Sequence, residues 1–194
     1  GQYVTYINYS HIKDYFAQLI DTTGNATYLM PKNLAQQDIF SLNFSAPVTI
    51  TKWWSAFATF NAYHSHYLAN LGPGSMINLK IDAFSIYVQQ TFTIKKGPSF
   101  ELSSSYNSPS VWGGTFKTNS YKFVDVGVQQ KVLKGAGIIK LSFTDVFNSM
   151  HWKATSNYGG TNILARGYEE EQQLKINFSY RFGNSKVKAA REIK

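Results

Sequence analysis

The sequence predicts an all-β fold, an antiparallel up-and-down transmembrane β-barrel of about eight strands. Residues 174–182 alternate between apolar and polar side chains without a break, so one side of an extended chain is apolar. The same alternation recurs along the chain, interrupted by turn residues and not by helical periods. Charged residues make up 15% of the chain, against roughly 25% in soluble domains, whereas aromatic residues reach 16%.

The net charge of +8 does not point to nucleic acid, because the basic residues are scattered singly along the strands. Their one cluster lies in residues 184–194, which we expect to be a basic tail after barrel strands in residues 1–183. Cysteine is absent, which excludes disulfides and thiolate metal sites. Residues 53–79 carry no charge, but their Asn, His, Gly and Pro residues argue against a membrane-spanning helix.

The first four strands are expected at about residues 3–19, 36–50, 53–67 and 76–94. A loop is expected at residues 21–32, where Pro31 would stop the extended chain. The next connection, at residues 51–52, is tight, and residues 69–75 form a further loop. In the fourth strand the apolar phase slips near Asp82 and Ala83, which predicts a β-bulge.

The last four strands are expected at about residues 100–107, 117–133, 139–156 and 162–182, with a loop at 108–115. Short turns at 51–52, 95–98 and 134–137 alternate with longer connections at 20–35, 68–75 and 108–116. Outer-membrane barrels have short periplasmic turns and long extracellular loops. We therefore expect a bacterial outer-membrane protein with its chain end in the periplasm.

The polar face of these strands is built mainly from Ser, Thr, Asn and Gln, which suits a hydrated lumen better than an exterior facing solvent. Aromatic residues near the short turns would form an interfacial girdle; they are Trp53, Trp54, Phe100, Tyr180 and Phe182. On the closing strand the residues predicted to face lipid are Leu174, Ile176, Phe178, Tyr180 and Phe182.

No phosphate loop, nucleophile elbow or acid–base pair is present, so we expect no enzyme, no catalytic residue and no cofactor. His64 and His66 share one face of a strand and could pair on a metal, but loop-proximal polar residues are the favoured interpretation. Trp112, Trp152 and Tyr158 could stack on a ligand at the outer ends of the strands. Asp145 and Asn148 indicate a turn or bulge, since both side chains satisfy backbone groups locally.

Residues 178–191 resemble the C-terminal signature of Bacteroidetes outer-membrane β-barrel proteins of the TonB-dependent receptor superfamily. Residues 141–148 resemble the penultimate-strand motif of those proteins, and Asn33-Leu34 and Pro47…Trp53-Trp54 are also similar to them. The resemblance implies a barrel of about twenty-two strands with an N-terminal plug, which imports a nutrient or chelate with energy from the TonB complex.

The plug and the TonB-contacting box have no counterpart here, so the resemblance covers only about the last eight strands. It implies a barrel-wall segment whose partners are outer-membrane lipid, the barrel-assembly machinery that reads Phe182, and the remainder of a receptor that contacts TonB. Two alternatives stay open. One is a self-contained eight-stranded outer-membrane barrel with a structural or adhesive role, and the other is a soluble ligand-binding β-barrel. Pairing between residues 3–19 and 173–182 would indicate the closed eight-stranded barrel.

Overall fold

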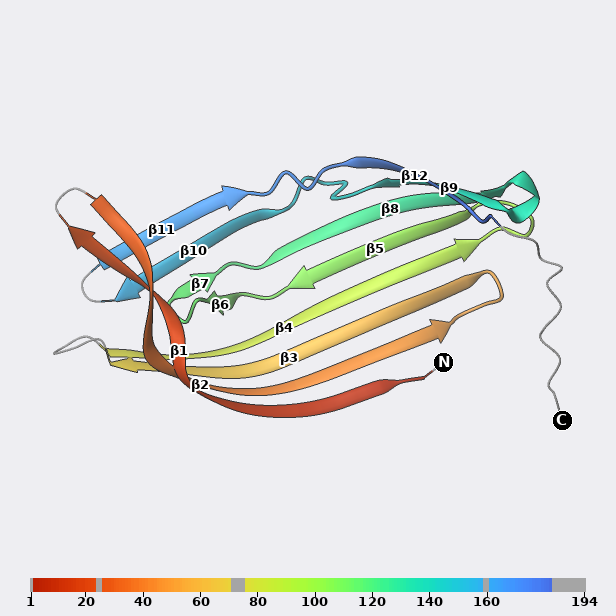
Figure 1. The fold of residues 1–194 in the computed structure, drawn as a ribbon. Helices are drawn as coiled ribbons and strands as arrows, with labels where there is room; N and C mark the ends of the chain where they lie inside the picture. Colours follow the sequence, from red (N-terminus) through yellow and green to blue (C-terminus); the bar gives the residue numbers. More distant parts are fainter. Residues whose placement is uncertain (1, 24–25, 71–75, 159–160, 183–194) are drawn as a thin grey trace, which may run out of the picture.

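The computed structural model describes residues 2–23, 26–70, 76–158 and 161–182, and most of these residues lie in β-strands. Figure 1 shows long strands lying side by side in a curved sheet. The strands are β1 (Val4–Thr23), β2 (Ala26–Thr49), β3 (Trp54–Asn70), β4 (Met76–Thr93), β5 (Ser99–Asn107), β6 (Ser110–Trp112), β7 (Phe116–Thr118), β8 (Tyr121–Val132), β9 (Gly137–Phe143), β10 (His151–Tyr158), β11 (Thr161–Tyr168) and β12 (Leu174–Tyr180). A single turn of 3-10 helix, Leu133–Gly135, joins β8 to β9. Among the described residues no helix has the length and apolarity needed to cross a membrane.

The strands form two antiparallel sheets, in the orders β1-β2-β3-β4-β5-β8-β9-β12 and β11-β10-β7-β6. The fifth predicted strand is β5. Each of the last three predicted strands is interrupted once, so that β7 and β8, β9 and β10, and β11 and β12 follow one another in the chain. The antiparallel up-and-down order is therefore confirmed. The main sheet is open, because no pairing joins β1 to β12 in the part of the chain that the structure describes.

The predicted loop at residues 21–32 is wrong, because β1 and β2 continue as a long hairpin in which Gln18 pairs with Pro31. Among the described residues β3 pairs with β2 only from Ala35 onward, so no described strand pairs with the other side of Pro31, a position where proline is tolerated. The predicted loop at 108–115 likewise contains most of the small β6–β7 hairpin. The predicted eighth strand is broken at residues 169–173, between β11 and β12. The basic tail at 184–194 lies outside the described residues.

The predicted β-bulge near Asp82 and Ala83 is also wrong, because β3 and β4 pair in one unbroken register along their whole length. The apolar phase slips because the two faces of the sheet exchange polarity at this point. Ile77 and Leu79 lie on the face that we call the inner face, toward which the β1–β2 hairpin curls. Phe84 and Ile86 have the opposite parity and lie on the outer face.

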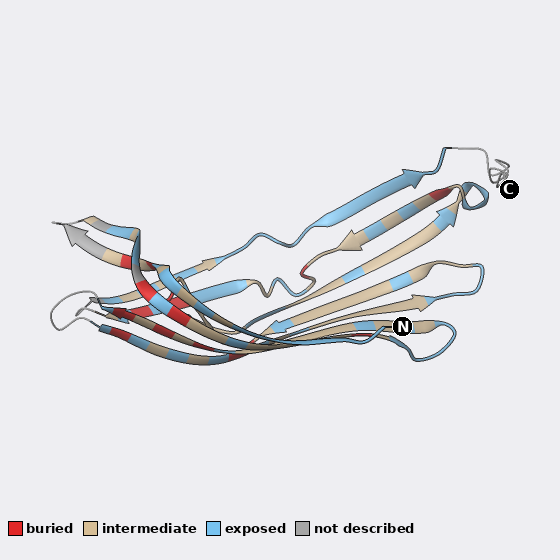
Figure 2. Cartoon of the chain, turned by 60° about the horizontal axis from the view of Figure 1, so that its bottom comes forward, coloured by how far each residue is buried: buried red, intermediate tan, exposed pale blue. Residues whose placement is uncertain are grey.

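A small apolar core covers the inner face of the sheet at the strand ends over which the β1–β2 hairpin bends. Figure 2 shows most of the buried residues gathered at this end, where the hairpin bends over the sheet. The bend follows a register shift between Ile12 and Tyr15, where Asp14 adopts a φ of 58°. The core consists of Ala17, Leu19, Ala35, Ala69 and Ile77, with Tyr15, Leu79 and Tyr158 packed against it.

Hydrogen bonds tie the curled hairpin to the segment between β6 and β7. The Gln18 amide donates to the Gly113 carbonyl at 2.8 Å, and the Thr115 hydroxyl donates to the Gln18 carbonyl at 2.6 Å. Gly113 has a φ of 60°, and a Cβ atom there would lie 2.6 Å from Gln18 Cγ. Only glycine permits this close approach, so the sequence Gly113-Gly114 fixes where the hairpin docks.

The connection between β9 and β10 is organised by Asp145, which is 1% exposed. Its carboxylate accepts hydrogen bonds from the Ser149 amide, the Ser149 hydroxyl and the Met150 amide, at 2.8 to 3.1 Å. Its own amide donates to Asp125 Oδ1 at 2.8 Å. Asp145 and Asn148 both have positive φ, 42° and 49°, which confirms the turn predicted from these two residues.

Replacing Asp145 should destabilise the protein, because three donors would lose their acceptor in a buried site. We expect Asp145→Ala to lower the free energy of unfolding by about 2–4 kcal/mol, and Asp145→Asn to lower it by less because asparagine tolerates positive φ. The measurement is urea unfolding in detergent micelles. Asp82→Ala is the matched control, since the side chain of Asp82 is 88% exposed. It should lower the free energy of unfolding by no more than about 1 kcal/mol. Equal losses in the two alanine variants would contradict the role given to Asp145.

Candidate functional site

The inner face of the sheet is mainly polar over the length that lies between the apolar core and the other ends of the strands. We call this surface the polar wall. Its side chains bond from strand to strand: Ser45 to Thr59 between β2 and β3, and Asn61 to Ser85 between β3 and β4, both at 3.3 Å. These residues are opposite one another in the register, so the hydroxyl and amide groups form rows across the sheet. The polar wall consists of Ser45, Thr59, Asn61, Ser85, Tyr87, Gln89, Glu101, Ser103, Ser105 and Lys140, with Asn177 further along the sheet.

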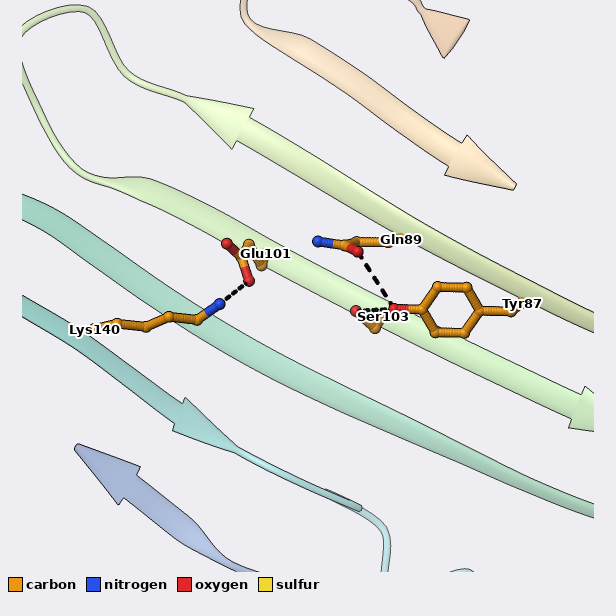
Figure 3. Close-up of polar contacts among 5 residues, drawn as sticks. All are labelled: Tyr87, Gln89, Glu101, Ser103 and Lys140. Atoms are coloured by element: carbon orange, nitrogen blue, oxygen red, sulfur yellow. Dashed lines mark hydrogen bonds and ion pairs between the residues drawn. The ribbon is translucent and has the colours of Figure 1, made fainter. Parts of the chain in front are cut away.

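Figure 3 shows the next part of the polar wall, over β4, β5 and β9. The Tyr87 hydroxyl lies 3.4 Å from both Gln89 Oε1 and Ser103 Oγ. Lys140 Nζ on β9 lies 2.5 Å from Glu101 Oε2 on β5, although β8 runs between these two strands.

Gly127 on β8 makes the long reach of this ion pair possible. It is directly opposite Glu101 on β5 and Ser142 on β9. A Cβ atom at Gly127 would lie 3.7 Å from Glu101 Oε2, so a larger side chain would occupy the space through which the two charges meet. Within this ion pair the two charges neutralise each other. The wall can therefore offer many hydroxyl and amide groups to a hydrated solute.

The outer face over the same span is apolar. On β3 it presents Trp54, Ala56, Ala58, Phe60 and Ala62 in phase. We call this surface, with the residues in register with it on the other strands, the apolar band. Aromatic rings cluster along it: Trp54 lies 5.7 Å from Phe92 between ring centroids, and Phe60 lies 6.2 Å from Phe84. The aromatic residues near the short turns also meet in pairs, Trp53 with Trp54 at 6.1 Å and Tyr180 with Phe182 at 4.6 Å.

Away from the short turns, the apolar band stops at pairs of polar side chains that join neighbouring strands. His11 Nδ1 lies 2.8 Å from Asp38 Oδ1, and His64 Nδ1 lies 2.7 Å from Asp82 Oδ1. Tyr9 donates its hydroxyl hydrogen to Asp38 at 2.8 Å. Neither Asp38 nor Asp82 was predicted as a site residue, because their partners lie on neighbouring strands and only the register reveals them.

The predicted site residues are not brought together. His64 and His66 share the outer face of β3, but each bonds to its own neighbour on β4, Asp82 and Asn78. They lie within a strand and not beside a loop. Among the described residues no group of three or more His, Cys, Asp or Glu side chains is placed to hold a metal ion.

The three aromatic candidates have separate surroundings. Trp112 on β6 lies 5.6 Å from Phe116 between ring centroids. The indole of Trp152 on β10 covers Gly167 on β11, where a Cβ atom would lie 2.8 Å from the ring. Tyr158 packs against the apolar core. Their role as ligand contacts stays a prediction.

The closing strand has an exposed apolar face. Leu174, Ile176, Phe178, Tyr180 and Phe182 are all exposed, and the one described strand that pairs with β12 is β9. The prediction that these five residues face lipid is consistent with this geometry and stays a prediction.

The reach of Lys140 across β8 gives a testable prediction. Gly127→Leu should separate Lys140 from Glu101 and lower the free energy of unfolding by about 1–2 kcal/mol. Gly127→Ala is the control and should be neutral or slightly stabilising, since its Cβ would make only ordinary contacts. The measurement is gel electrophoresis of samples heated to increasing temperatures, which gives the temperature at which the band of the folded protein disappears. If the leucine variant is equally destabilised when Glu101→Gln and Lys140→Gln are also present, the effect does not come from the ion pair.

Comparison with known proteins adds one finding. No curated protein and no solved structure matches the chain. A family model, described as the outer membrane protein beta-barrel family, matches residues 1–180. This match spans every strand, including the polar wall and the apolar band. The chain belongs to the outer membrane protein beta-barrel family.

Proposed function

We propose that this chain is a wall segment of a TonB-dependent receptor-type transporter of the Bacteroidetes outer membrane, which imports a nutrient or chelate. The polar wall would line the passage and the apolar band would face lipid. The chain would do no covalent chemistry. Family membership supports an outer-membrane location, and the distribution of polarity over the two faces supports the role of a wall.

The height of the apolar band supports a membrane location. On β3 the band begins at Trp54 and ends before His64, ten residues further along the strand. At about 3.3 Å per residue this is about 33 Å along the strand. With the strands tilted by about 40° the band is about 25 Å high, which is the height typical of membrane barrels.

On each strand the apolar band stops at a polar residue, and we call the line through these residues the polar boundary. The angle at which this boundary crosses the strands is the observation that carries the proposal. On β8 the boundary lies at Lys122, the first charged residue on the outer face of this strand. A row of directly paired residues runs across the sheet from Lys122 and includes Ile86 on β4 and Thr5 on β1. The boundary on β4 is Asp82, four residues beyond Ile86, and on β1 it is His11, six residues beyond Thr5.

The boundary therefore shifts by six residues over five strand-to-strand steps, which is about 20 Å along the strands for about 24 Å across them. The resulting angle of about 40° equals the tilt of strands in membrane barrels. A boundary with this slant is level when the strands stand tilted in a bilayer. A soluble barrel has no reason to keep such a level boundary.

The open sheet supports a place within a larger barrel, because in the part of the chain that the structure describes β1 and β12 each pair along one edge. Further strands of the receptor would pair with these edges. The self-contained eight-stranded barrel would require pairing between β1 and β12. The soluble ligand-binding barrel would require an apolar interior, whereas the polar wall lies inside and the apolar band outside.

Orientation and partners follow from the same proposal. The short turns and Phe182 would lie in the periplasm, where the barrel-assembly machinery would read Phe182 as the terminal aromatic of the barrel. Outer-membrane lipid would surround the apolar band. The TonB complex would act through parts of the receptor that carry the plug.

The absence of cysteine allows a labelling test of the two faces. We expect Ser85→Cys and Tyr87→Cys to react with a small charged maleimide in intact cells, because they would line a hydrated passage. Ile86→Cys and Val88→Cys should not react, because they would face lipid. The measurement is the extent of labelling after denaturation and electrophoresis.

Each alternative gives a different labelling pattern. Reaction at 86 and 88 but not at 85 and 87 would indicate a soluble barrel with a closed interior. Protection at all four positions would indicate an eight-stranded barrel whose interior is filled by side chains.

The mass of the native polypeptide tests the proposed receptor. An antibody against the β4–β5 hairpin should detect, in outer-membrane fractions, a polypeptide several times heavier than 21.9 kDa. Formaldehyde treatment of cells should also link this polypeptide to TonB. A polypeptide close to 21.9 kDa without a TonB adduct would contradict the proposal and favour the eight-stranded barrel.

A further inference from the structure

A groove lies in the apolar band between β2, β3 and β4, with a volume of about 700 Å³. This volume lies in the range of ligand-binding clefts, about 300–1,000 Å³, but the groove is shallow and open. The small side chain of Ala62 lies at the floor of the groove, and larger apolar side chains form its walls. They are Phe40, Leu42, Phe60 and Phe84.

The groove ends at the polar boundary. His64 and Asp82 line its last part and bond to each other at 2.7 Å. A ligand in the groove would therefore have an apolar portion within the band and a polar portion at the level of this pair. That distribution is the one found in a membrane lipid.

The charge beyond the groove favours an anionic headgroup. Asp82 is already paired with His64, and Asp38 is paired with His11 and Tyr9. Lys80 lies two residues beyond Asp82 on the same face of β4 and is exposed. No ion pair of Lys80 occurs among the described residues, so its ammonium group can meet a phosphate.

We infer that this groove seats one acyl chain of a phosphate-bearing outer-leaflet lipid, with the lipid phosphate on Lys80. The inference rests on the proposed membrane location of the apolar band. It adds a specific lipid site to a surface that otherwise meets the bilayer as a solvent.

The test uses the native polypeptide purified in detergent and titrated with phosphatidylglycerol, with bound lipid counted by native mass spectrometry. The wild-type protein should bind one phosphatidylglycerol more tightly than any further ones. Ala62→Trp fills the groove and should weaken this binding by about tenfold or more. Ala58→Trp is the matched control, because Ala58 lies on the same face of β3 outside the groove, and it should bind as wild type does.

The headgroup is tested separately. Lys80→Gln should weaken phosphatidylglycerol binding several-fold and leave the binding of diacylglycerol, which has no phosphate, unchanged. Equal weakening by Ala58→Trp and Ala62→Trp, or an absence of any preferred first lipid, would overturn the inference. Flotation of the wild-type protein with phosphatidylglycerol vesicles reports membrane insertion alone. A protein that floats but retains no lipid would refute the groove and leave the proposed wall intact, whereas a protein that does not float would refute both.

Discussion

The unbroken antiparallel register from β2 to β4 is the constraint on which the rest of this structure depends. From β2 to β4 each residue has a fixed partner over most of the strand length, so a side chain on one face stays on that face from one end to the other. A polar ladder, an apolar band and an apolar core can then occupy different lengths of the same strands. A bulge at Asp82 would have reversed the faces beyond it and brought the core residues Ile77 and Leu79 to the exterior.

The exchange of polarity between the faces divides each long strand into two functional lengths. In one length, polar groups face inward and apolar groups outward, which is the arrangement of a wall between water and lipid. In the other length, Ala69 and Ile77 face inward and Lys80 and His66 face outward, as in a protein surrounded by water. The strands thus continue past the proposed membrane, where a chain with shorter strands would have only loops.

Glycine and aspartate determine the irregular points of the fold. Gly113 lets the β1–β2 hairpin approach the β6–β7 segment, and Gly127 leaves space for an ion pair across β8. Asp145 accepts the hydrogen bonds that hold the turn between β9 and β10, where the chain passes from one sheet to the other. Asp145 was recognised in the sequence because a carboxylate commonly closes a turn locally. The roles of Gly113 and Gly127 could not be recognised, because each depends on a partner far away in the chain.

The sequence by itself determined the all-β class, the antiparallel order of the strands and the alternation of the closing strand, because these depend on local periodicity and on turn residues. Only the tertiary structure decided that Pro31 lies within a strand, that the phase change at Asp82 is an exchange of faces, and that His64 bonds to Asp82. Each of these depends on which strand lies alongside and in which register. Pairing energies between distant residues set that register, and no local pattern records them.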